Sequence, residues 1–347
     1  MSPQSKPVEV QIEDRKVKLT NLDKVLYPET GFSKAQVIDY YTRIAPVLLP
    51  HTRDHPLTLK RYPNGVEGEF FYEKNCPSHR PPWVQTAKVW SGGNNRDMYY
   101  CLAQDLPTLV WLANLATLEL HTSLSYATKL EQPRTLVFDL DPGPPANIVD
   151  CCRIGLLVRD LFAEYGLKSY AKTSGSKGLQ LYLPLNTSVG YLETKIVSKG
   201  IAVLFEQERP KEVVSRQLKE LRAGKVLIDW SQNDQYKTTI NVYSLRARAR
   251  PTVSTPVTWE EVAECAKARD PQRLVFDSEQ VLRRVAAQGD HFEPVLKLKQ
   301  KLPKKLVERF SDTPLTRRKG PGRGRYPPQK GQREAWVREK PAGAPGS

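Results

Sequence analysis

Residues 135–145 have the sequence Thr-Leu-Val-Phe-Asp-Leu-Asp-Pro-Gly-Pro-Pro, an apolar run that ends in two carboxylates and a proline-rich stop. Such a run predicts a buried β-strand. Because side chains alternate between the two faces of a strand, Asp139 and Asp141 project from one face, and Phe138 and Leu140 from the other. The strand therefore brings two acidic groups into one small volume.

Two carboxylates this close repel each other unless protons or cations intervene, and hard oxygen ligands suit Mg²⁺ or Mn²⁺. Two such ions, roughly 3.5 to 4 Å apart, can activate an attacking hydroxyl and hold a leaving pyrophosphate, but they need a further carboxylate. Asp229, at the end of the apolar run 226–230, is the predicted third ligand. The alternative is that the Asp pair only caps the following turn. Similar tripeptides occur in haloacid dehalogenase phosphatases and glycosyltransferases.

On both sides of this strand the chain alternates between helix and strand patterns. Upstream, a capping-box-like signal at 33–36 opens a predicted helix over 34–48, residues 56–102 hold short β-runs typical of an antiparallel sheet, and 106–120 has helical spacing. Downstream, the patterns predict a helix over 148–165, strands over 169–173, 179–185 and 226–230, and helices over 191–221 and 258–287.

A glycine-containing turn separates two of the predicted strands. Residues 173–178, Thr-Ser-Gly-Ser-Lys-Gly, combine hydroxyls, flexible backbone amides and an ammonium group, which is the chemistry that binds a triphosphate. The stretch does not match the phosphate-binding loop G-x-x-x-x-G-K-[ST]. A hairpin turn without ligand function is the alternative.

Two further stretches suit nucleic acid. Arg246, Arg248 and Arg250 alternate, so an extended backbone would line them up as a cationic row for phosphates, and otherwise they form a solvated edge. Aromatic and basic residues are interleaved near position 70, a mixture that stacks bases while holding phosphates. These residues are Phe70, Phe71, Lys60, Arg61 and Lys74. Core packing of at least one of the two phenylalanines is the alternative.

The chain is basic, with 53 Lys and Arg against 38 Asp and Glu and a formal charge of +15. From Lys301 onward, 13 basic residues face four acidic ones, so this stretch supplies +9 of the total. A polyanionic partner is favoured. Residues 312–347, rich in Gly, Pro, Arg and Lys, are predicted to be a disordered tail that either adds phosphate affinity or only aids solubility.

The five cysteines form no paired C-x-x-C array, and an odd number favours a reduced compartment over a disulfide framework. Cys76 and His79 alone are too few for a zinc site. No apolar stretch resembles a signal peptide or a membrane span. We therefore expect a cytoplasmic protein, associated with the nucleoid.

Five separated motifs, in this order, resemble the polymerase domain of bacterial ligase D, a member of the archaeo-eukaryotic primase superfamily that acts in non-homologous end joining. They lie at 59–66, 118–121, 137–143, 173–179 and 228–230, and the resemblance runs from about 17 to 289. It implies an α+β primase-type core of two small mixed or antiparallel sheets flanked by helices, with a metal site in the cleft between them. Residues 1–311 form the catalytic domain, with a 5′-phosphate-binding part at about 17–50 and a core at about 51–290.

The resemblance also implies roles for individual residues. Asp139, Asp141 and Asp229 match the family's ligands for two divalent ions, Mn²⁺ or Mg²⁺. Lys24 and Lys34 match a pair that grips the 5′-phosphate of the downstream DNA strand, and Phe70 and Phe71 match aromatics that stack near the template and the nucleotide. The residues assigned to the incoming triphosphate and its surroundings are Ser174, Lys177, Gln180, Arg246, His121 and Lys60.

Two features depart from the family pattern. Gln180 stands where the family usually has a histidine facing the triphosphate, and an amide carries neither a proton nor a positive charge. No Lys-x-Asp-Gly adenylation motif is present, which suggests a stand-alone polymerase. The implied function is a primase-polymerase that adds ribo- or deoxynucleotides to primer ends at gaps or breaks, working with a DNA ligase and a Ku-type end-binding protein. The alternative is a catalytically weak module that bridges DNA ends.

Overall fold

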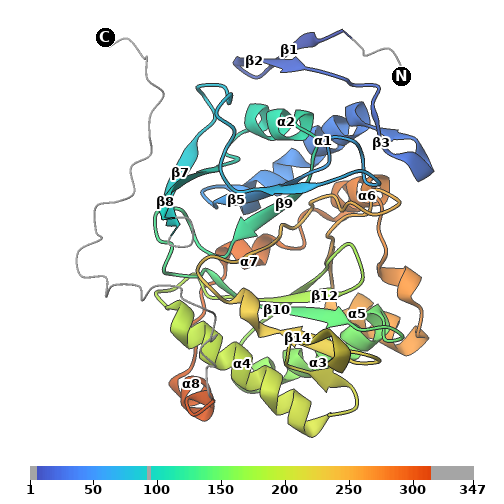
Figure 1. The fold of residues 1–347 in the computed structure, drawn as a ribbon. Coiled ribbons are helices and arrows are strands. Elements are labelled where there is room, and N and C mark those ends of the chain that lie inside the picture. The colour runs from blue at the N-terminus through green and yellow to red at the C-terminus, as the bar shows by residue number, and fades with distance from the viewer. Residues whose placement is uncertain (1–5, 92–94, 314–347) are drawn as a thin grey trace.

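The computed structural model describes residues 6–91 and 95–313. Helices and two sheets are stacked in layers (Figure 1). Helices α1 and α2 lie on one side, followed by a four-stranded sheet, a six-stranded sheet, and a layer that contains α3, α4 and α5. The α+β architecture predicted from the motifs is confirmed.

The larger sheet carries the predicted Asp-x-Asp strand at its centre. Its strands, in spatial order, are β13 (Val213–Val214), β14 (Val226–Asp229), β10 (Thr135–Pro142), β12 (Leu179–Pro184), β11 (Tyr170–Thr173) and β16 (Pro256–Val257). Phe138 and Leu140 pack with helices α3 and α4 in one core, whereas Val137 belongs to the core shared with the smaller sheet. The predicted alternation of faces along β10 is thereby confirmed.

The smaller sheet has the order β15 (Thr238–Ile240), β9 (Thr117–Ser123), β5 (Leu57–Arg61) and β6 (Phe71–Glu73), all antiparallel. Tyr182 of β12 and Thr239 of β15 are hydrogen-bonded at 2.9 Å and link the two sheets. Separate hairpins are formed by β1 (Val8–Ile12) with β2 (Arg15–Leu19), β3 (Val25–Tyr27) with β4 (Phe32–Ser33), and β7 (Thr86–Ser91) with β8 (Arg96–Cys101).

The helices begin at residues that cap their free amides. Ser33 and Gln36 form the capping box of α1, as predicted, and Asn147 with Asp150 forms that of α3. Helix α1 continues past the predicted end at 48, because His51 and Thr52 are also buried. The helices are α1 (Lys34–Thr52), α2 (Leu106–Asn114), α3 (Ile148–Glu164), α4 (Tyr191–Glu208), α5 (Trp259–Ala268), α6 (Ser278–Gln288), α7 (Glu293–Lys297) and α8 (Lys304–Phe310).

The prediction of one helix over 106–120 is wrong in its second half. Helix α2 ends at Asn114, Ala116 adopts a left-handed φ of 57°, and β9 begins at Thr117. Leu118 and Leu120 alternate with polar residues, which is the period of a strand rather than of a helix. The element that carries His121 is therefore a central strand of the smaller sheet.

Two other predicted helices are also interrupted. The pattern over 191–221 is helical only as far as Glu208, since Pro210 lacks an amide hydrogen and disfavours helix at the residue before it. The pattern over 258–287 breaks at Arg269, which is left-handed at φ 55°, and a 3-10 turn at Pro271–Leu274 separates α5 from α6. Local breakers outweighed the apolar periodicity in both places.

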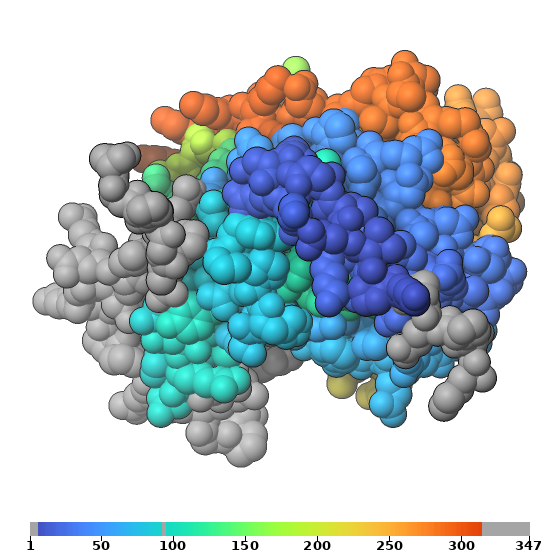
Figure 2. Space-filling model, turned by 90° about the horizontal axis from the view of Figure 1, so that it is seen from above, coloured from blue at the N-terminus to red at the C-terminus, as the bar shows by residue number. Residues whose placement is uncertain are grey.

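The cysteine prediction needs a correction, because Cys76 and Cys101 form a disulfide with their Cα atoms 5.1 Å apart. The loop after β6 brings Cys76 beside β8, where its amide donates to the carbonyl of Tyr99. Viewed from above, the dark blue N-terminal segment lies on the surface between lighter blue and cyan segments, and the orange C-terminal part lies beyond the lighter blue one (Figure 2). Within the described ranges, no helix is long and apolar enough to cross a membrane. Most of the predicted tail, residues 314–347, lies outside the described residues.

Candidate active site

The three predicted metal ligands lie on one face of the larger sheet, near its middle. Asp139 lies directly opposite Asp229 in the antiparallel register of β10 and β14. Residues paired in this way have side chains on the same face of a sheet, here the face turned to the smaller sheet. Asp141 lies two residues along β10 on the same face. Residues 90 positions apart in the chain are thus neighbours, which the sequence motif alone did not establish.

The surroundings of Asp139 penalise its negative charge. Burial, together with the charges of Asp229 and Asp141, raises the pKa of Asp139 to about 6, while a hydrogen bond from Gln180 and the charge of Lys172 oppose the shift. Asp141 is more exposed and lies 3.6 Å from the guanidinium of Arg222. Asp139 therefore carries its negative charge at a penalty that a bound cation would relieve.

Asp229 is held by neighbours that donate to its carboxylate. Gln217 Nε2 donates to Oδ1 at 3.0 Å, the amide of Ser231 donates to the same oxygen at 2.9 Å, and Gln232 Nε2 donates to Oδ2 at 3.2 Å. In the described part of the chain, no three His, Cys, Asp or Glu side chains already converge as ligands of one ion. The acids share a face and the hard oxygen chemistry of a Mg²⁺ or Mn²⁺ site, but Asp141 would have to leave Arg222 to join them.

A row of polar side chains crosses four strands of the larger sheet. From Asp229 on β14 it passes through Asp139 on β10 and Gln180 on β12 to Lys172 on β11, each residue being the register partner of the next. Gln180 is 3 % exposed and Lys172 is fully buried. Lys172 Nζ donates to Gln180 Oε1 and to Ser254 Oγ, both at 2.6 Å. Gln180 therefore faces a metal-ligand candidate, and its assignment to the triphosphate stays a prediction.

The turn at 174–178 is built tightly against the end of β10. Ser174 Oγ accepts hydrogen bonds from the amides of Ser176 and Gly178. A side chain at Gly178 would lie 2.2 Å from the carbonyl oxygen of Leu140, and Gly175 has a left-handed φ of 67°. Only glycine satisfies both positions. Lys177 at the tip of the turn is exposed and lines a cavity of about 460 Å³ together with Arg248 and Arg250.

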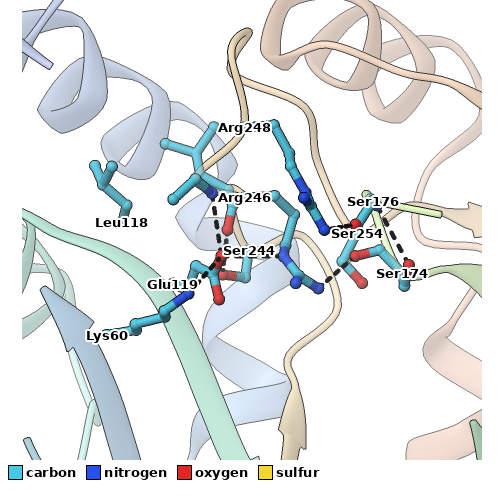
Figure 3. A network of polar contacts seen from close by, with 12 residues as sticks. Lys60, Leu118, Glu119, Ser174, Ser176, Ser244, Arg246, Arg248 and Ser254 are labelled. Carbon is cyan, nitrogen blue, oxygen red and sulfur yellow. Dashed lines mark hydrogen bonds and ion pairs between the residues drawn. The ribbon is translucent and has the colours of Figure 1, made fainter. Parts of the chain in front are cut away.

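A second acid, Glu119 on β9, organises a cluster of cationic side chains (Figure 3). Glu119 is 2 % exposed. It accepts hydrogen bonds from His121 Nε2 at 2.9 Å and Arg246 Nε at 3.2 Å, and Lys60 Nζ lies 3.9 Å away. Burial alone would raise the pKa of Glu119, but His121, Arg246 and Lys60 outweigh it and lower the pKa to about 2. Burial lowers the pKa of His121, although its hydrogen bond to Glu119 and the charge of that residue oppose the shift.

The arginines at 246, 248 and 250 do not form the cationic row that an extended backbone would give. The backbone turns there, with the amide of Arg248 donating to the carbonyl of Arg246. Arg246 reaches both Glu119 and the carbonyl oxygen of Ser174, at 2.7 Å for the latter, whereas Arg248 donates to Ser176 Oγ (Figure 3). The two arginines thus tie the glycine turn of one sheet to the Glu119 cluster of the other.

The aromatic residues of β6 lie at an exposed edge. Phe70 is 50 % exposed and Phe71 is 43 % exposed, so neither is a core residue. Lys60 Nζ lies 4.1 Å from the ring centroid of Phe70, and the Arg61 guanidinium lies 5.1 Å from that of Phe71. The alternative of core packing is therefore wrong, although Phe70 already stacks on Tyr62, with ring centroids 5.3 Å apart.

The two lysines predicted to hold a 5′-phosphate are close neighbours. Lys24 Nζ donates to Asn64 at 2.9 Å, and Lys34 Nζ donates to the carbonyl of Thr20 at 2.6 Å. Burial, together with the charges of Lys24 and Arg61, lowers the pKa of Lys34 to about 8. Cations that repel one another in this way favour binding of an anion between them.

Residue patterns missed several parts of this arrangement. Glu119 is two residues from His121 on a strand, so period-2 alternation could have identified the pair. Lys172 alternates with Tyr170 on β11, but the burial of a lysine has no signature in the sequence. The partners of Asp141 and Asp229, namely Arg222, Gln217 and Gln232, come from a segment interpreted as helix or turn, and no signal pointed to them.

Comparisons with known proteins agree with these motifs. A family model described as the LigD primase-polymerase domain matches residues 33–292. The chain is 41 % identical over 282 residues to the multifunctional non-homologous end joining protein LigD of Mycolicibacterium smegmatis, covering 81 % of this chain and 36 % of the relative. It is 30 % identical over 289 residues to the bifunctional non-homologous end joining protein LigD of Bacillus subtilis, covering 83 % and 44 %.

A solved structure extends the likeness to the fold. The polymerase domain from Mycobacterium tuberculosis ligase D, in complex with DNA, matches with a TM-score of 0.75 and 39 % identity, covering 83 % of this chain and all of that one. The chain spans less than half the length of the curated relatives. Both the sequence motifs and the arrangement of the two sheets thus lead to the same conclusion: the chain belongs to the LigD primase-polymerase domain family.

Proposed function

We propose that this protein is a template-directed nucleotidyltransferase that extends primer 3′ ends at short gaps or broken DNA ends in non-homologous end joining. The observation that carries the proposal is the pairing of Asp139 with Asp229, with Asp141 beside them, on a face turned towards a cationic cluster. Membership of the LigD primase-polymerase family supports it. The DNA-bound state of the related polymerase domain supports DNA as the partner.

Asp139, Asp141 and Asp229 are the residues that would hold two Mn²⁺ or Mg²⁺ ions. When bound, such ions lower the pKa of a primer hydroxyl and neutralise the departing pyrophosphate. The pKa of about 6 at Asp139 supports this assignment, because it reflects burial beside two other carboxylates, which a bound cation would offset.

The remaining side chains position the substrates. Arg246, Arg248 and Lys177 lie at the glycine turn and would bind the triphosphate, with hydroxyls and amides of the turn as further donors. Phe70 and Phe71 would stack on bases near the nucleotide. Lys24 and Lys34 would hold the 5′-phosphate across a gap, which makes a gap with that phosphate the preferred substrate. A DNA ligase and a Ku-type end-binding protein are the partners that this role implies.

A gap-filling assay tests the proposal. A primer annealed to a template, with a downstream strand ending in either a 5′-phosphate or a 5′-hydroxyl, is incubated with ribo- or deoxynucleotides and Mn²⁺ or Mg²⁺. We expect additions dictated by the template, faster with the 5′-phosphate, and stopped by a chelator. Tight binding to these ends without any extension under Mn²⁺ would instead identify a DNA-bridging module.

A further inference from the structure

The polar row on the larger sheet ends in a buried lysine to which the proposed mechanism gives no role. We propose that Lys172 is a positioning residue that fixes the side-chain amide of Gln180, so that its N–H group holds the carboxylate of Asp139 in place for a divalent cation. The inference rests on the proposed metal-binding role of Asp139. It concerns how this chain, with Gln180, supports that carboxylate.

The hydrogen bonds leave Gln180 one orientation. Its Oε1 accepts from Lys172 Nζ at 2.6 Å, so its amide nitrogen is the end that donates to Asp139. The reverse orientation would set the amide oxygen against a carboxylate and leave two acceptors facing each other. A glutamine alone can rotate by half a turn between these states at little cost, since its two ends have nearly the same shape. The hydrogen bond from Lys172 Nζ removes that freedom.

Lys172 is itself fixed by its own surroundings. Its Nζ also donates to Ser254 Oγ at 2.6 Å, and Ser254 in turn donates to the carbonyl of Thr173 at 3.0 Å. The ammonium lies 5.5 Å from the ring centroid of Tyr182. Burial lowers the pKa of Lys172 well below its usual range. Neutral or charged, however, the amine keeps at least two N–H donors, enough for both acceptors.

Burying a lysine costs free energy unless its amine is hydrogen-bonded. A fully buried amine is stable only where its hydrogen bonds are satisfied, and both acceptors of Lys172 lie on the strands that flank Asp139 or on the segment beside them. Residues that orient a metal ligand by hydrogen bonds typically change metal affinity by about 10-fold to 100-fold when removed. Lys172 acts on Asp139 indirectly, because its hydrogen bond is made to Gln180 and not to the carboxylate.

The experiment measures Mn²⁺ binding by the full-length protein, through the paramagnetic resonance signal of free Mn²⁺, without DNA or nucleotide. The proteins are the wild type, Lys172→Met, Gln180→Met and the double variant, and thermal melts check that each is folded. Methionine keeps the length of both side chains and removes their hydrogen bonds. We expect each single variant to bind Mn²⁺ about 10-fold or more weakly, and the double variant to bind no more weakly than Gln180→Met.

The sign of the Lys172→Met effect separates positioning from charge. A lysine that acted only through its charge would repel the cation, so its removal would tighten Mn²⁺ binding. Tighter or unchanged binding would overturn the inference, and so would losses that add up in the double variant. Wild-type protein that binds no Mn²⁺ would overturn both the proposed function and the inference. Binding by the wild type that Lys172→Met does not weaken would overturn the inference alone.

Ser254→Ala provides the same test if Lys172→Met does not fold. This variant keeps the lysine and its bond to Gln180 but removes the second acceptor, so the ammonium is less firmly held. We expect an intermediate loss of Mn²⁺ affinity in the wild-type background and none in the Gln180→Met background. An equal loss in both backgrounds would contradict a role exerted through Gln180.

Discussion

Asp139 on the larger sheet and Glu119 on the smaller sheet are acids with opposite surroundings. Glu119 is enclosed by His121, Arg246 and Lys60, and its pKa falls to about 2. Asp139 faces two other carboxylates, and its pKa rises to about 6. The first acid already has its cations within the chain, and the second does not. The difference teaches that Glu119 is neutralised within the fold, whereas the surroundings of Asp139 fit its proposed role as a ligand for a cation from solution.

Removing two of the acids on the larger sheet, Asp139 and Asp141, tests this comparison with the largest expected effect. Replacing Asp139 and Asp141 with Ala should lower primer extension by roughly a thousandfold or more, because metal-assisted charge stabilisation is worth several kcal/mol. DNA binding, measured by fluorescence anisotropy, should stay near the wild-type value. Normal extension by the double variant would refute the assignment of the site.

Glu119→Gln tests the other half of the comparison. It leaves Arg246 and Lys60 without their buried counter-charge, and breaking such a pair costs about 3 to 5 kcal/mol. We expect the free energy of unfolding to fall by about 3 kcal/mol in urea denaturation. Asp97→Asn is the matched control, since its partner Lys88 lies 2.9 Å away in an exposed pair, where less than about 1 kcal/mol is expected. Equal losses would contradict the contrast between the sites.

Asp139→Asn should have the opposite effect on stability. A carboxyl whose pKa is raised in the folded state adds stability at low pH that is lost as the pH rises through about 6. The metal-free variant should therefore be more stable than the wild type by about 1 to 3 kcal/mol near pH 8. The gain should shrink as the pH falls from about 6 towards 4. Urea denaturation with a chelator across this range measures it, and a destabilised variant at high pH would be inconsistent with an uncompensated charge.

Arg248→Ala is the test with the smallest expected effect, and it compares Arg248 with its neighbour Arg246. Arg246 is neutralised by Glu119, while Arg248 has an exposed guanidinium that contacts only a hydroxyl among its described hydrogen bonds. Its loss should raise the KM for the nucleotide about tenfold, equivalent to about 1.4 kcal/mol of a charge-assisted contact. The unfolding free energy should change by less than about 0.5 kcal/mol. A loss of stability without a change in KM would assign Arg248 to the fold instead.

The sequence predicted those parts of the molecule whose signals are local. The run at 135–141 predicted a strand with both acids on one face, and the serine cap predicted the start of α1, because alternation and capping act over a few residues. The stretch 118–120 falls within a predicted helix although Leu118 and Leu120 alternate, and the sequence left open whether the arginine segment is extended. Both depend on neighbours that only the fold supplies.

The electrostatics of the site could not be predicted in the same way. The charge on Asp139 depends on Asp229, which is 90 residues away in sequence, and on Gln180 on the opposite strand. A lysine at 172 looks like a solvated side chain until β16 and the segment around Ser254 cover it. Burial and pairing of charges are tertiary properties, so sequence motifs identified the acids without revealing which of them lacks a partner.

The pleat of β10 links folding to chemistry. Because its side chains alternate, a slip of one residue against β12 or β14 would turn Asp139 and Asp141 towards the helices and expose Phe138 and Leu140 instead. Burying two carboxylates among apolar side chains is costly, so a misaligned sheet is disfavoured by the same residues that we propose as cation ligands. If the proposed site takes up Mn²⁺, that uptake also reports on refolded material, because only the correct strand alignment places both acids on the same face as Asp229.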